Sequence, residues 1–124
     1  MVRKPRRDPE REQRIMMEIV VDAHDAEEQS MGWYYYLEDQ LRFPFAATCV
    51  TKRATSPLHV NEQVEIIGLP GEGECGQEMV VTIRRERGEL AVPLAQLQPT
   101  AAADERTRRA VADWHYWVQM GYEF

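Results

Sequence analysis

Five acidic side chains form two groups whose chemistry suits a hard metal cation. One group is an adjacent pair and the other lies on or beside the glycine-rich stretch 69–77; the residues are Glu38, Asp39, Glu72, Glu74 and Glu78. Calcium takes about six to eight oxygen ligands, from carboxylates and from backbone carbonyls of the kind a glycine-rich loop exposes. The spacing is therefore compatible with a calcium site assembled from separate segments, although by itself it favours a solvated acidic surface.

The sequence contains no EF-hand loop at its N-terminal acidic segment. Counting from Asp22, the third and fifth loop positions are His24 and Ala26, and the sixth is Glu27 instead of the glycine that the EF-hand turn needs. Asp22 and Asp25 form a third and weaker acidic group. Magnesium is a possible competitor, but it demands a tighter octahedral geometry than scattered loop carboxylates provide.

Other chemistries find little support in the sequence. Gly71 and Gly73 lie in a stretch that has neither the Lys-Ser/Thr of a phosphate loop nor a dinucleotide fingerprint, and no nucleophile elbow occurs. The histidines are scattered, and His115 is interpreted as an interfacial histidine among aromatics. Cys49 and Cys75 lack the spacing of a zinc ribbon and predict two reduced thiols in the cytoplasm. We therefore expect a protein that is not an enzyme.

The net charge of −6 is unevenly distributed. Residues 1–14 carry six Lys/Arg against three Asp/Glu, whereas Ile15 to Leu41 holds seven acids and no Lys or Arg. Such an acidic field repels nucleic acid and attracts cations. No apolar run reaches the roughly 20 residues of a membrane span, and no signal peptide follows the basic start. We expect no nucleic-acid or membrane partner, and a monomer.

The pattern of apolar residues predicts which elements position the carboxylates. Asp8-Pro9 starts a helix whose apolar stripe runs from Ile15 to Ala23, and a capping box at Asp25 starts a second helix over about 26–41. Gly32 is expected to kink or split that second helix. The last helix spans about 104–120, its inner face is Trp-rich, and it should meet the second helix.

Between the last two helices the periodicity changes to that of strands. Strands are expected over 45–53, 63–69, 79–85 and 89–92, with Gly88 taking positive φ in a hairpin and a further strand leaving through residues 92–97. Consecutive short strands favour an antiparallel sheet. The expected fold is α+β: a small SH3-like barrel or sheet of four to five strands, with N-terminal helices and a C-terminal helix packed against it. Residues 1–7 form a basic, flexible tail, and residues 8–124 form one domain.

Several blocks together resemble the CcbP-type calcium-binding proteins, which are small acidic bacterial proteins best known from cyanobacteria. The blocks are EIVVDA (18–23), MGWYYYLEDQL (31–41), FPF (43–45), TSPL (55–58), LAVPL (90–94), ADWHYWV (112–118) and GYEF (121–124). The resemblance runs from about Asp8 to the C-terminus. The segment 69–73 departs from the family pattern.

The resemblance implies reversible Ca²⁺ binding without an EF-hand and a role in buffering cytosolic calcium. It places Glu38 and Asp39 in a matched block, makes Asp39 the first choice for the main site, and implies Glu74 and Glu78 as ligands from the acidic loop, with Glu72 less closely matched. The alternative is an SH3-like protein-interaction module whose acidic surface is structural.

Overall fold

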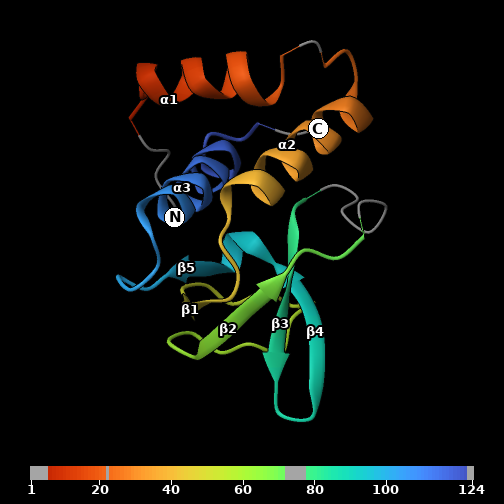
Figure 1. Cartoon of the computed structure of the whole chain (residues 1–124), viewed down its shortest axis with the longest axis vertical. Coiled ribbons are helices and arrows are strands. Elements are labelled where there is room, and N and C mark those ends of the chain that lie inside the picture. Colours follow the sequence, from red (N-terminus) through yellow and green to blue (C-terminus); the bar gives the residue numbers. More distant parts are fainter. Residues whose placement is uncertain (1–5, 22, 72–77, 123–124) are drawn as a thin grey trace.

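This computed structural model describes residues 6–21, 23–71 and 78–122. Helices and strands form two layers, with the helices gathered on one side of an antiparallel sheet (Figure 1). The elements are α1 (Pro9–Arg14), the π-helix η1 (Ile15–Ile19), α2 (Ala26–Gln40), β1 (Phe45–Cys49), β2 (Gln63–Gly68), β3 (Val80–Arg85), β4 (Gly88–Pro93), the 3₁₀ turn η3 (Leu94–Gln96), β5 (Leu97–Pro99) and α3 (Glu105–Gln119).

The helix starts follow the predicted capping chemistry. The side chain of Asp8 accepts a hydrogen bond from the Arg11 amide at 3.0 Å, and Asp25 accepts one from the Glu28 amide at 2.8 Å. Asp104 caps α3 in the same way by accepting from the Thr107 amide. Hydrogen bonding with Thr107, through its side chain first and its amide second, lowers the pKa of Asp104. Each cap satisfies an amide that has no partner inside its helix.

The first helix departs from prediction in its second half. The expected helical stripe to Ala23 is interrupted, because the chain widens into a π-helix over Ile15–Ile19. Ile15 and Ile19 are buried, but Met16, expected on the same stripe, is 56% exposed. The wider i→i+5 turn rotates successive side chains differently from an α-helix, so an α-helical period assigns them to the wrong face.

Gly32 serves close packing instead of breaking α2. The helix runs without interruption from Ala26 to Gln40, which contradicts the expected kink or split. A Cβ atom at Gly32 would overlap the backbone carbonyl oxygen of Ile19. The missing side chain therefore lets η1 approach the backbone of α2 directly, and this packing offsets the low helix propensity of glycine.

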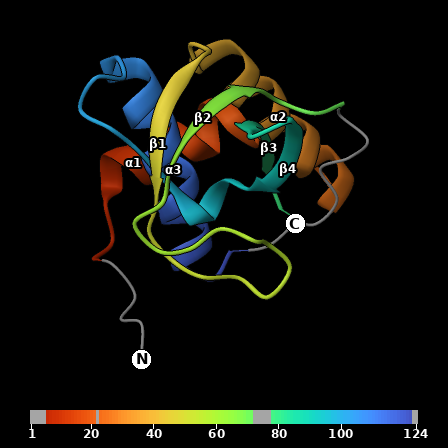
Figure 2. The ribbon, with the colours of Figure 1, turned by 90° about the horizontal axis from the view of Figure 1, so that it is seen from below.

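The sheet has five strands in the order β4-β3-β2-β1-β5, and every neighbouring pair is antiparallel. Seen from below, β1 and β2 cross in front of the helical layer (Figure 2). The expected α+β class, strand number and helical cover are confirmed, but the SH3-like barrel is not, because the sheet is open. Strand β5 is only three residues long and pairs with β1, and α3 packs beside it and η3.

Two details of the strands also differ from expectation. Strand β1 ends at Cys49 instead of continuing to Arg53. In the β3–β4 hairpin the positive φ of 45° belongs to Glu86 and not to Gly88, which already begins β4. Gly121, just after the last helix, takes a positive φ of 82°.

The core forms where the Trp-rich helices meet each other and the sheet. Trp33 of α2 contacts Trp114 and Trp117 of α3, with ring centroids 5.0 and 5.6 Å apart in edge-on geometry. This confirms the predicted meeting of the two helices. His115 Nε2 lies 2.7 Å from the Leu97 carbonyl oxygen, so it is a satisfied interfacial histidine, and burial lowers its pKa. None of the helices in the described residues is long and apolar enough to cross a membrane.

Replacing Gly32 with Ala should destabilise the fold. The new methyl group would force η1 away from α2, and overpacking of this kind costs about 1–3 kcal/mol. Gly88→Ala is the matched control, because a Cβ at Gly88 meets nothing within 4 Å. Urea unfolding of both variants measures the difference. Equal stability of Gly32→Ala and the wild type would contradict the close-packing role.

Candidate metal site

Glu38 and Asp39 lie on the last turn of α2, where both are exposed. The carbonyl groups at this end give a helix partial negative charge, which favours a nearby cation. The last turn of α2 contains no basic residue that would already supply one. The end of α2 therefore combines two carboxylates with a negative helix terminus.

The contacts of α2 place these two acids on different sides of the helix. Tyr34 donates a hydrogen bond from its hydroxyl to the Pro70 carbonyl oxygen at 2.8 Å, which fixes the chain just after β2 against α2. Glu38 follows Tyr34 by four residues and so shares its side of the helix. Asp39 instead faces α3, where its Oδ2 lies 3.6 Å from Nη2 of Arg106, and it also accepts from Gln40 Nε2 at 2.8 Å.

Glu78 lies just before β3 and is paired with an arginine. Nη2 of Arg53 lies 2.9 Å from Oε1 and 2.7 Å from Oε2 of Glu78. Both side chains are 35% exposed. Glu78 is thus oriented by a cation from the β1–β2 connection, in a position that solvent and ions can reach.

Glu72 and Glu74 lie outside the described residues. In the part of the chain that is described, no group of three or more His, Cys, Asp or Glu side chains converges in a way that could hold a metal. Glu38, Asp39 and Glu78 are oxygen donors, so their chemistry suits calcium, but they are not brought together as one site. The predicted set of five ligands stays a prediction.

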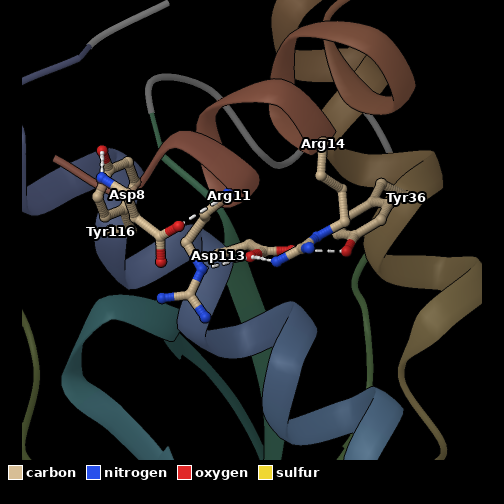
Figure 3. Close-up of polar contacts among 6 residues, drawn as sticks. All are labelled: Asp8, Arg11, Arg14, Tyr36, Asp113 and Tyr116. Carbon is tan, nitrogen blue, oxygen red and sulfur yellow. Dashed lines mark hydrogen bonds and ion pairs between the residues drawn. The ribbon is translucent and has the colours of Figure 1, made fainter.

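A buried carboxylate that the sequence analysis did not single out binds the helices together (Figure 3). Asp113 of α3 is completely buried. Arg14 donates from Nε to Oδ2 at 3.0 Å and from Nη2 to Oδ1 at 2.6 Å, and Tyr36 donates its hydroxyl to Oδ2 at 2.7 Å. Arg11 Nε lies 2.8 Å from Oδ1. One carboxylate therefore joins α1, α2 and α3.

This cluster is electrostatically saturated. The hydrogen bond to Asp113 is the main cause that raises the pKa of Arg14, which keeps its guanidinium charged. Burial, followed by the hydrogen bond to Asp113, raises the pKa of Tyr36, so this phenol stays a neutral donor. Because two guanidinium groups and a phenol already surround Asp113, it is a structural anion and not a candidate metal ligand.

The sequence did contain a signal for Asp113. It follows Ala110 by three residues and precedes Trp117 by four, so it lies on the same helical stripe as these apolar residues. An acid on an apolar stripe predicts a buried ion pair, since a buried charge needs partners. The arginines that pair with Asp113 are about 100 residues away in the chain, so no local sequence pattern identifies them.

The chain is similar to known calcium-binding proteins along its length. A family model described as calcium binding, of CcbP type, matches residues 13–118. The crystal structure of CcbP from Anabaena is similar at 37% identity and a TM-score of 0.85, over 99% of this chain and 100% of that one. A structure of a calcium binding protein in the calcium-binding form matches at 37% identity and a TM-score of 0.85, over 100% of both chains. No curated protein matches.

Asp113→Asn should destabilise the fold strongly. The substitution keeps the shape of the side chain but leaves Arg11 and Arg14 facing each other without an anion, and breaking a buried pair in this way costs about 3–5 kcal/mol. The measurement is urea unfolding at neutral pH, with Glu65→Gln as the control, because Glu65 is 46% exposed and pairs only with Arg84 in the described contacts. A loss under about 1 kcal/mol, the range of surface pairs, would contradict the role of this cluster.

Proposed function

Because the chain belongs to the CcbP family of calcium-binding proteins, we propose that it binds Ca²⁺ reversibly without an EF-hand and buffers calcium in the cytoplasm as a monomer. The observation that carries this proposal is the similarity to a calcium-binding form over the whole length of the chain, at 37% identity. The proposal assigns the chain no catalytic role.

The proposed ligands are the carboxylates predicted from the sequence. They are Asp39, Glu38, Glu72, Glu74 and Glu78. Glu38 and Asp39 lie exposed at the negative end of α2. Tyr34 fixes Pro70, near the start of the acidic stretch, on the side of α2 that also carries Glu38. Glu78 lies at the other end of that stretch and presents both oxygens in one direction, toward Arg53.

The proposed mechanism is relief of charge repulsion. In the calcium-free protein the carboxylates repel one another and are only partly neutralised by arginines from other elements. Calcium supplies the missing positive charge and is held by oxygens from the end of α2 and from the stretch before β3. The exposed Glu38 and Asp39 and the partly exposed Glu78 allow calcium to enter and leave readily, as a buffer requires. Binding to the folded state alone also raises the melting temperature.

Calorimetric titration with Ca²⁺ tests the proposal. The wild type should give saturable heat with a Kd on the order of 10⁻⁷–10⁻⁵ M, the range of reversible calcium sensors. Asp39→Asn and Glu78→Gln should each weaken the strong site by roughly tenfold or more, because each removes a negative charge from the ligand set. Millimolar Mg²⁺ should compete poorly.

Glu65→Gln is the matched control, since it removes one exposed carboxylate from β2 that is not in the proposed set. Its calcium affinity should equal that of the wild type. Absence of saturable heat with the wild type overturns the proposed function. Normal affinity in Asp39→Asn or in Glu78→Gln removes that residue from the ligand set and leaves the function standing.

A further inference from the structure

We propose that Arg53 is a built-in competitor of calcium for Glu78 and that this arginine sets the calcium affinity of the protein. The inference rests on the proposed function, and it assigns a role to a residue outside the acidic ligand set. It follows from the geometry of the Arg53–Glu78 pair, from the way each partner is anchored, and from the exposure of the pair.

The geometry of the pair is that of a single cation on two oxygens. One nitrogen, Nη2 of Arg53, lies 2.9 Å from Oε1 and 2.7 Å from Oε2 of Glu78. An arginine pair can also use two nitrogens side by side, one for each oxygen. Here one nitrogen lies within hydrogen-bond distance of both oxygens, on the side where a calcium ion bound by both carboxylate oxygens would lie. The two cations therefore exclude each other at this position.

The backbone next to Arg53 is fixed by hydrogen bonds to buried residues. Two residues earlier, the Thr51 carbonyl accepts hydrogen bonds from Gln96 Nε2 at 3.1 Å and from Cys49 Sγ at 3.2 Å. Gln96 and Cys49 are completely buried. The Arg53 carbonyl itself accepts from the Ser56 amide at 3.1 Å. The guanidinium is thus presented from an ordered connection that stays in place when the ion pair opens.

Glu78 is anchored in a similar way. The next residue, Met79, is completely buried, and its carbonyl accepts a hydrogen bond from the Leu94 amide at 3.0 Å. The backbone just before β3 is therefore fixed next to Glu78, and only the side chain of Glu78 needs to turn. Displacement of Arg53 by calcium requires a change of side-chain partners and no rearrangement of the sheet.

The exposure of the pair makes it replaceable. Both side chains are 35% exposed, and partly exposed pairs of this kind are weak, because solvent screens them. The contrast is Asp113, whose carboxylate has no exposure and keeps two arginines permanently. The Arg106–Asp39 contact is looser than the Arg53–Glu78 pair, at 3.6 Å with exposures of 60% and 74%. Of the two arginines that face described members of the proposed ligand set, Arg53 is the stronger competitor.

The test compares Arg53→Gln with Arg84→Gln in calcium titrations. Arg84 is paired with Glu65 across β2 and β3 at 2.9 Å, so the two substitutions remove the same charge and each frees one glutamate. Arg53→Gln should bind calcium roughly fivefold or more tightly than Arg84→Gln, the lower range of coupling between two ligands of one protein. In a Glu78→Gln background the advantage of Arg53→Gln should disappear.

A second measurement needs no substitution at Arg53. In ¹H–¹⁵N spectra of the wild type, the Arg53 Nε–H signal should move on calcium saturation toward its position in Glu78→Gln, while the Arg84 signal stays in place. Equal affinities of Arg53→Gln and Arg84→Gln, or an Arg53 signal that calcium does not move, overturn the inference while wild-type binding upholds the function. Absence of calcium heat in both the wild type and Arg53→Gln overturns the two together.

Discussion

The fold depends on one buried carboxylate. Asp113 has no solvent exposure, and a carboxylate buried in this way needs polar partners, which here are Arg11, Arg14 and Tyr36. These partners come from α1 and α2, so the cluster fixes both elements on α3. Helix α1 has no buried residue of its own and relies on such polar contacts for its place. The orientation of α2, and with it that of Glu38 and Asp39, follows from this constraint.

Burial separates two uses of the same chemistry in this molecule. Arginine pairs with a carboxylate at Asp113 and again at Glu78, at similar distances. At Asp113 no ion can reach the carboxylate, so the pair is a permanent part of the fold. At Glu78 solvent reaches both partners, so another cation can take the place of the guanidinium. A protein whose proposed function is to exchange calcium needs both kinds, the first to hold the scaffold and the second to keep the site reversible.

Local chemistry made much of the fold predictable. The caps Asp8 and Asp25 predicted where α1 and α2 begin, and the second helix ends within a residue of its predicted bound. Long-range relations were not predictable in this way. The open edges of the sheet depend on how distant strands pair, and the close approach of Gly32 to Ile19 depends on how two helices pack. The π-helix over Ile15–Ile19 is local, but an α-helical period does not predict its wider turn. The acidic groups were visible, but the arginines facing Asp39 and Glu78 were not, because neither is near its partner in the sequence.

In the proposed calcium-bound state, calcium replaces an arginine at a carboxylate fixed by this scaffold. The most direct measurement is a crystal structure of the protein grown with Ca²⁺. We predict a calcium ion bound by both oxygens of Glu78 together with oxygens from the end of α2, with the Arg53 guanidinium turned away and the Asp113 cluster unchanged. A calcium-loaded structure in which Glu78 keeps its contact with Arg53 and binds no ion would contradict the claim.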